Sequence, residues 1–138
     1  MTTLPLSNKT WPVPPRSDRA RLLSFIKRKE GLSKEEFFEY FYKKHVPAML
    51  EVMPKPGFLK LHLMEINDEI NAILAGYGAK TMQDYDAAMI IEAPSWDDLF
   101  KVRNDEKFFQ ARMEDEAHFI DISATMPIPL AVIPFLDN

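Results

Sequence analysis

The chain has 138 residues, of which 46% are hydrophobic and 28% charged, and it carries a net charge of −4 with no cysteine. This length is typical of one domain that can bury a core, and the composition is that of an ordinary globular protein. The acidic balance argues against a nucleic-acid partner, and no apolar run reaches the roughly 20 residues that cross a bilayer. The lack of cysteine excludes disulfides, thiolate nucleophiles and cysteine-ligated metals.

The N-terminal residues 1–17 include four of the eleven prolines of the chain. Because proline removes backbone donors and blocks helix formation, we predict an extended arm here and a folded domain over residues 18–138. Trp11 in this arm is expected to pack on another surface, such as a neighbouring subunit. The first residues lack a basic region followed by an apolar stretch, so no secretory signal is evident and a cytoplasmic location is expected.

Residues 21–29 predict the first strand, because apolar side chains occupy both of its faces, as in a sheet that is covered on both sides. A helix is expected to follow from about Lys34 towards Met49, since Ser33 and Glu36 have the spacing of a capping box. Pro47 cannot donate a hydrogen bond within this helix, so a kink or stop is predicted just after His45.

The second half of the chain contains three more predicted strands. The first of them spans Phe58–Ile66, and alternation places Phe58, Lys60, His62 and Met64 on one of its faces. Residues 67–84 have no clear period and predict a long loop with room for one helical turn. Two further strands are expected over Ala87–Glu92 and over residues 128–135, and the prolines of the latter indicate an edge or a subunit boundary.

A helical region is predicted between the last two strands. Ser95 caps it, and it extends to about Ile120 with a break near Asn104. Its buried side is expected to comprise Leu99, Phe100, Phe108, Phe109, Met113, Ala117 and Ile120.

The predicted order is β-α-β-β-α-β, which is the ferredoxin-like α+β arrangement of a four-stranded antiparallel sheet with two helices on one face. Two helices can cover only one face, yet the strands are apolar on both. We therefore expect a homodimer in which the sheets of two copies pack together into an α/β barrel.

Several segments carry a family resemblance. Residues 25–37, Tyr40-Phe41 and His45 resemble the opening of EthD-domain proteins, which form dimeric α/β barrels. Three later segments, namely Lys60-Leu61-His62, Tyr85-Asp86 and residues 115–121, are similar to fungal polyketide-cluster members of that family. These members include decarboxylases that act on atrochrysone carboxylic acid. The resemblance covers roughly residues 20–135. It implies a cofactor-free enzyme acting on a polycyclic aromatic polyketide. Phe41 stands where the family usually has tryptophan, which is expected to change the pocket shape rather than the chemistry.

His45 is the first candidate for proton transfer. It follows Phe41 by four residues and Phe37 by eight, so the three share one face of the predicted helix. A histidine in an aromatic, apolar wall can act as a general acid or base toward a ligand. The alternative is a core histidine whose ring nitrogens are bonded to backbone carbonyls, and the family motif favours the catalytic interpretation.

His118 is the second candidate, near the end of the last predicted helix. Glu114, Asp115 and Asp121 lie three or four residues away, and a carboxylate on one ring nitrogen would fix the tautomer and raise the basicity of the other. A solvated histidine that complements the helix dipole is an equally supported alternative.

Substrate-binding roles are predicted for a further set of residues. Lys60 and Arg28 are candidates for a substrate carboxylate, and His62, on the same strand face as Lys60, is a candidate for proton transfer if that face lines the cavity. Contact of Lys60 and His62 with a partner chain or with solvent is the slightly favoured alternative. The remaining predicted contacts are Phe41, Tyr42 and Asp121. No metal is expected, because the three histidines are 17 and 56 residues apart and form no ligand motif.

The sequence-based hypothesis is a cofactor-independent decarboxylase of a polycyclic aromatic polyketide acid, with His45 and His118 as general acid and base. The alternatives are a polyketide cyclase or dehydratase, a cofactor-free oxygenase of the same fold, and a non-catalytic dimeric module that binds a hydrophobic ligand. No membrane or nucleic-acid partner is expected.

Overall fold

The computed structural model describes residues 12–138, so the first part of the predicted arm, with Trp11, lies outside the described residues. Residues 12–19 contain no helix or strand. The elements that follow are β1 (Ala20–Ile26), α1 (Lys34–Tyr40), the π-helical turn η1 (Phe41–His45), α2 (Val46–Val52), β2 (Lys60–Glu65), α3 (Asp68–Gly76), β3 (Ala87–Ala93), α4 (Trp96–Arg103), α5 (Glu106–Glu116), the 3-10 turn η2 (Ile122–Ala124) and β4 (Met126–Leu130).

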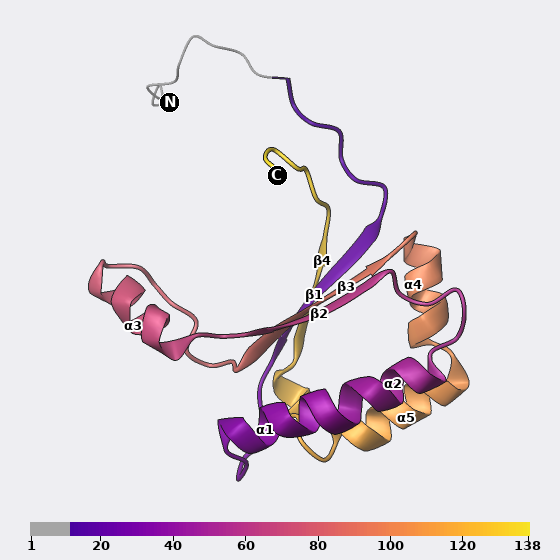
Figure 1. Cartoon of the computed structure of the whole chain (residues 1–138), viewed down its shortest axis with the longest axis horizontal. Coiled ribbons are helices and arrows are strands. Elements are labelled where there is room, and N and C mark those ends of the chain that lie inside the picture. Colours follow the sequence, from indigo (N-terminus) through magenta and orange to yellow (C-terminus); the bar gives the residue numbers. More distant parts are fainter. Residues whose placement is uncertain (1–11) are drawn as a thin grey trace.

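The four strands form one antiparallel sheet in the order β2-β3-β1-β4. Helices α1, α2, α4 and α5 lie together on one face of this sheet, whereas α3 projects beyond its end (Figure 1). This is the predicted ferredoxin-like α+β fold, with the first helical unit running from α1 to α2 and the second from α4 to α5.

The inner strand β1 has a buried and a less buried face. Ala20, Leu22, Ser24 and Ile26 alternate as buried residues on the side of the helices. The intervening side chains belong to the other face, where Leu23 pairs with Ile90 and Ile128, and Phe25 with Ala88 and Met126. Both faces of the sheet are therefore apolar, as predicted, but helices cover only one; the second is called the open face below.

The first helical unit does not stop after His45. Ser33 and Glu36 form the predicted capping box, and the helix then continues through η1, where the N–H of Val46 donates to the carbonyl of Phe41. Pro47 follows in the first turn of α2, a position where its missing N–H costs little. The predicted stop is thus wrong, because a widened turn accommodates the proline without ending the helix.

The predicted loop over residues 67–84 contains a nine-residue helix, α3, which begins at the N-cap Asn67. None of its residues is buried, and Ile70, Ile73 and Leu74 are exposed. The sequence signal for a helix is the regular spacing of the apolar residues on its buried face. Helix α3 has no buried face in this chain, so this signal is weak. No helix within residues 12–138 is long and apolar enough to cross a membrane.

The strand ends differ from the sequence prediction, and β1 stops at Ile26 rather than at residue 29. β2 begins at Lys60, and Phe58 precedes it on the side of the helices, where its ring lies 6.1 Å from that of Phe108. Phe58 therefore does not share a face with Lys60, because the chain bends before regular pairing starts. β4 ends at Leu130 rather than at residue 135, and it lies at the edge of the sheet, as its prolines indicated.

The second helical unit is broken at Asn104 and Asp105, which cap α4 and α5 respectively. Leu99, Phe108 and Ile120 are buried as predicted, but Phe100, Phe109, Met113 and Ala117 are exposed. Because the helix is interrupted, the buried side of α5 does not continue the 3.6-residue spacing of the buried side of α4. The buried residues predicted for α5 by extending that spacing are therefore partly wrong. Arg112 and Glu116 take inward positions instead, one and two turns after Phe108.

Candidate active site

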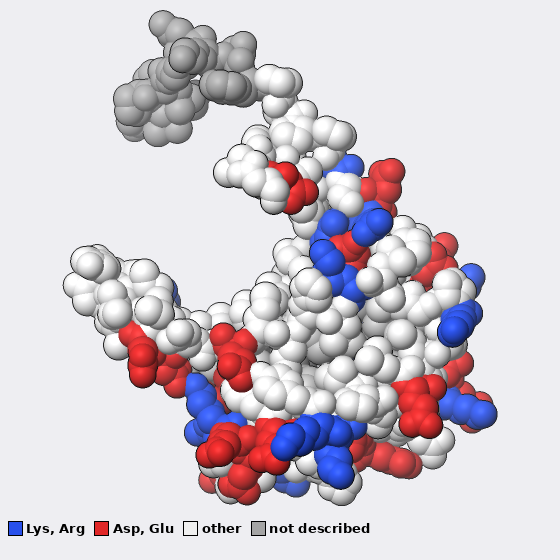
Figure 2. Space-filling model, in the orientation of Figure 1, with Lys and Arg blue, Asp and Glu red and all other residues white. Residues whose placement is uncertain are grey.

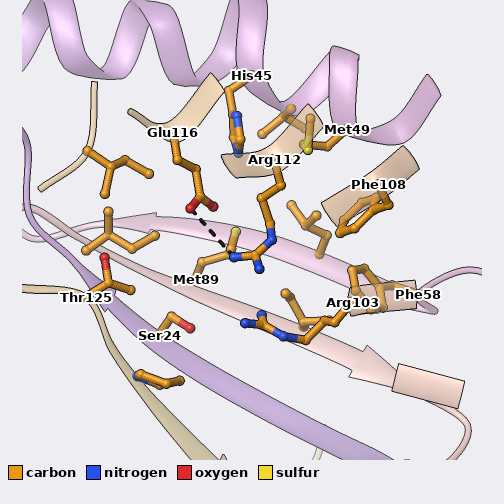
Figure 3. Close-up of a pocket in the computed structure, with 16 residues that line it drawn as sticks. Ser24, His45, Met49, Phe58, Met89, Arg103, Phe108, Arg112, Glu116 and Thr125 are labelled. Carbon is orange, nitrogen blue, oxygen red and sulfur yellow. Dashed lines mark ion pairs between the residues drawn. The ribbon is translucent and has the colours of Figure 1, made fainter. Parts of the chain in front are cut away.

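A cavity lies between the helix layer and the covered face of the sheet. It contains about 730 Å³ of space free of protein atoms, a figure that includes open solvent at its mouth. Most of its wall is apolar, from residues such as Met49, Phe58, Met89 and Phe108. Its polar groups are Ser24, His45, Arg103, Arg112, Glu116 and Thr125 (Figure 3).

His45 is the last residue of the π-helical turn, and its side chain is buried and points into the cavity (Figure 3). Its ring packs edge-on against Phe41, with 5.4 Å between centroids, and lies 4.9 Å from the ring of Phe119. Single π turns within α-helices are frequently found at functional sites. Here the widened turn sets the direction of the only cavity-lining histidine within residues 12–138.

Asp115 on α5 holds the imidazole. Its Oδ2 lies 2.6 Å from His45 Nδ1, and its Oδ1 accepts a hydrogen bond of 2.6 Å from the phenol of Tyr40. An ionised carboxylate only accepts hydrogen bonds, so this arrangement favours the tautomer in which Nδ1 carries the proton. Nε2 is then available to accept or return a proton on the cavity side.

Tyr40 supports this arrangement from α1. Its hydrogen bond to Asp115, together with burial and the charge of that carboxylate, raises the pKa of Tyr40 to about 12. The phenol therefore remains a donor throughout the neutral range. With both of its oxygens engaged, Asp115 connects α5 to the two successive segments of the first helical unit and fixes the position of His45.

Three charged residues share the cavity with His45. Arg112 and Glu116 lie four residues apart on α5, with 3.6 Å between Nη1 and Oε2, and Arg103 enters from the end of α4. Burial lowers the pKa of Arg103, and the neighbouring charge of Arg112 acts in the same direction. Burial also raises the pKa of the Glu116 carboxyl, against the opposing charges of Arg112, His45 and Arg103.

The other predicted catalytic residue, His118, does not reach the cavity. It is exposed after the end of α5, beside a shallow surface depression that also includes Glu114 and Asp115. The carboxylate of Asp115, which was predicted as a partner of His118, bonds to His45 and Tyr40 instead. Asp121 likewise lies outside the cavity and accepts a hydrogen bond from the hydroxyl of Ser123.

Lys60 and His62 lie on the open face of the sheet, away from the cavity. Lys60 Nζ is 3.8 Å from the buried Glu92 carboxylate, which also bonds to Arg19 and Arg21. The hydrogen bond from Arg19, together with the charges of Arg21 and Lys60, holds the pKa of Glu92 below its ordinary value despite burial. The neighbours of Lys60 are thus those of a structural ion cluster.

The three remaining predicted contacts are also outside the cavity. Arg28 pairs with Asp86 at 3.5 Å. Tyr42 is about half exposed and donates to Glu65 at the end of β2, and its partial burial and this hydrogen bond raise its pKa to about 12. Phe41 is fully buried against His45 and Phe119, where it supports the imidazole and does not line the cavity.

The sequence analysis did not identify Arg103, Arg112 or Glu116. A usable signal existed for the last two, because Phe108, Arg112 and Glu116 follow one another at four-residue spacing on a helix with a buried face. Charged residues on an apolar stripe indicate a polar site inside the layer. No group of three or more His, Asp or Glu side chains that could hold a metal ion occurs within residues 12–138.

The topology and the position of the cavity define a ferredoxin-like α+β protein with a partly polar cavity between its two layers. The sequence matches the EthD domain over residues 29–123, and the chain belongs to the EthD-domain family. No curated protein matches the chain at a significant level.

Solved structures of similar fold include SnoaB, a cofactor-independent oxygenase from Streptomyces nogalater, with 11% identity and a TM-score of 0.55. That match covers 88% of this chain and all of SnoaB. A variant of SnoaB matches with 12% identity and a TM-score of 0.51, covering 88% of this chain and 97% of the variant. A dimeric ferredoxin-like protein of unknown function from Bacteroides fragilis NCTC 9343 is 11% identical, with coverages of 86% and 99% and a TM-score of 0.49. At such identities the likeness concerns the fold.

Proposed function

We propose that this protein is a cofactor-independent enzyme that removes the carboxyl group of a polycyclic aromatic polyketide acid as CO2. The observation that carries the proposal is the buried His45, whose Nδ1 is held by Asp115 while its ring faces an apolar cavity. A largely apolar wall with a few converging polar groups suits a flat aromatic ligand with acidic oxygens. The sequence resemblance to fungal EthD-domain decarboxylases supports the same substrate class.

The chemistry requires one proton transfer. When the bond between the ring carbon and the carboxylate breaks, CO2 leaves and the electron pair moves onto the oxygen of a neighbouring ring carbonyl, which becomes an enolate. The imidazolium form of His45 then gives its Nε2 proton to the ring carbon, which restores a neutral product, and His45 takes up a proton from water. The apolar cavity favours this step because it favours loss of the carboxylate charge.

A cofactor-independent oxygenation is the second candidate. It is supported by the fold shared with SnoaB, which is a cofactor-independent oxygenase. In that reaction a neutral His45 would remove a proton from a phenol, and the resulting carbanion would react with O2. The two reactions need opposite protonation states of the same imidazole at the start of the cycle. They are separated by measuring CO2 release and O2 uptake with the same polyketide.

We also propose that the active form is a homodimer in which a second copy covers the open face. This face carries Leu23, Phe25 and Ile90 at its centre, and the adjoining Met64 and Met126 are exposed in the single chain. A space-filling view shows a hollow with few charged residues between α3 and the C-terminal segment that follows β4 (Figure 2). An apolar face of this kind is typical of a permanent subunit contact.

The test is release of CO2 from an anthrone carboxylic acid by the pure protein and its variants. We expect His45→Ala to lower kcat at least about 100-fold, as is usual for loss of a general acid. His118→Ala separates the two sequence-based candidates, and we expect it to retain activity because His118 lies outside the cavity. Full activity of His45→Ala would overturn the mechanism, while saturable binding without turnover by the wild-type protein would favour a binding module.

A further inference from the structure

Two arginines converge in the cavity. Arg112 extends from the middle of α5 and Arg103 from the last residue of α4, so they come from opposite sides of the break between the two helices. Figure 3 shows both guanidinium groups turned into the same part of the cavity, below His45. They are close enough for the charge of Arg112 to affect the pKa of Arg103.

The cavity wall does not balance these two charges. Glu116 is the only carboxylate among the lining residues, and its Oε2 lies 3.6 Å from Arg112 Nη1, beyond a good hydrogen bond. Within residues 12–138, the Nε of Arg112 is buried without a hydrogen-bond partner. Since burial favours the neutral form of Glu116, the wall is left with an excess of positive charge.

Partly buried guanidinium groups are costly unless an anion pairs with them, and their planar donors match oxyanions closely. A bound ligand can supply such an anion. In the proposed reaction, negative charge leaves the carboxylate and arrives on a ring oxygen. A cation beside the carboxylate would oppose that movement, whereas a cation beside the ring oxygen would favour it.

Building on the proposed function, we propose that Arg103 and Arg112 jointly bind the phenolic or enolic ring oxygen of the ligand, and not its carboxylate. The ligands are therefore fused aromatic rings that carry an ionisable hydroxyl group, or a carbonyl that can become an enolate. This oxygen lies at a distance from the group that reacts at His45. The two arginines act as an oxyanion-binding pair that compensates the charge developed as CO2 leaves.

A binding experiment without turnover tests the pair. The probe is 2-hydroxyanthraquinone, which absorbs at longer wavelength when its phenol ionises, so that the pKa of the bound phenol is read by titration. We expect the wild-type protein to lower this pKa relative to free probe. Arg103→Met and Arg112→Met should each raise the bound pKa by about one unit or more, equivalent to a tenfold loss of phenolate affinity.

Matched controls isolate the effect of position from that of net charge. Lys101→Met removes a cation from an exposed site on the same helix as Arg103 and should leave the bound pKa unchanged. Neutral anthraquinone should bind all variants within about threefold of wild type, because its affinity depends on the apolar wall. Arg103→Lys and Arg112→Lys keep a charge but lose the planar donors, and we expect intermediate values of the bound pKa.

Two results would overturn the inference. One is an unchanged bound pKa in the methionine and lysine variants. The other is a selective loss of affinity for anthraquinone-2-carboxylate with the phenolate unaffected, which would assign the arginines to the carboxylate. Because none of these probes turns over, an absence of CO2 release would refute the proposed function while leaving the arginine pair intact.

Discussion

At the scale of single residues, Asp115 and Glu116 are neighbours in the chain but have opposite roles around His45. Asp115 accepts two hydrogen bonds of 2.6 Å, from Tyr40 and from the imidazole. Glu116 lies inside the cavity, where burial raises its pKa. One carboxylate therefore fixes the imidazole from behind, while the next is exposed to whatever occupies the cavity.

Asp115 is a positioning residue, and Asp115→Asn tests this role. We expect kcat to fall by about 10- to 100-fold, because an amide can present either its N or its O to Nδ1 and no longer stabilises the imidazolium. KM should change little, since Asp115 does not line the cavity. The split between kcat and KM distinguishes this from a structural defect, which would change both and lower the midpoint of thermal unfolding.

Asp115→Asn retains the other groups around His45, which are Glu116, Arg112 and Tyr40. Tyr40→Phe is its companion, because it removes one hydrogen bond to Asp115 and keeps the carboxylate. A smaller loss, within about tenfold in kcat, is expected from a single hydrogen bond. An unchanged kcat in Asp115→Asn would argue against the assigned role.

At the scale of elements, the first helical unit shows how a proline can direct a catalytic side chain. The turn from Phe41 to His45 is π-helical, and Pro47 follows in the first turn of α2. In a regular α-helix the proline ring would clash with the carbonyl of Lys43, at a cost of about 3 kcal/mol. The widened turn avoids this clash and at the same time orients His45.

Pro47→Ala is expected to make the regular α-helical form accessible and to shift His45 away from Asp115. The midpoint of thermal unfolding should stay the same or rise, while kcat falls by about tenfold or more, as expected for a misplaced catalytic group. Ala48→Gly serves as the control, because it loosens the same helix by about 1 kcal/mol without restoring a donor. Unchanged kcat in Pro47→Ala would show that the proline does not maintain the turn.

The elements also show which features the sequence could predict. Ser33 and Ser95 cap their helices as predicted, because a hydroxyl acceptor before a helical segment is a local signal. Helix α3 was missed, since its apolar residues have no buried partner in the same chain. The inward side of α5 was assigned to the wrong residues, because the caps at Asn104 and Asp105 reset its phase.

The candidate site was predictable only where local spacing determined it. The four-residue spacing of Phe37, Phe41 and His45 predicted a shared aromatic face, and the ring of Phe41 packs against both of the others. Arg103 reaches the cavity from a different helix, so no local period connects it with Arg112. Lys60 and His62 were undecided between cavity and partner surface, because strand alternation gives two faces without saying which one the helices cover.

At the scale of the whole molecule, the proposed dimer is tested by Ile90→Glu, which places a charge at the centre of the open face opposite Leu23. We expect the wild-type protein to have the mass of a dimer in light scattering at micromolar concentration and the variant that of a monomer, since an isolated charge is expensive in an apolar contact. Leu50→Glu is the control, because Leu50 is 51% exposed on α2.

A variant Ile90→Glu that remains dimeric would exclude the open face as the contact. Activity of the monomeric variant is informative as well. The cavity lies on the opposite side of the sheet from this contact. Residual binding of neutral anthraquinone by the monomer would therefore indicate that each subunit has a complete pocket.

The π-helical turn also has a consequence for how the gene can change. A turn of this kind contains one residue more than the α turn that it replaces. Deletion of a single codon between Phe41 and His45 would remove this extra residue and return the turn that holds His45 to regular α-helical geometry, while the capping box before it, the helix after it and the strands on either side remain. Such a protein would keep its fold and lose the orientation of its imidazole. The number of residues between Ser33 and Pro47 could thus sort related sequences into those that retain this site and those that have lost it.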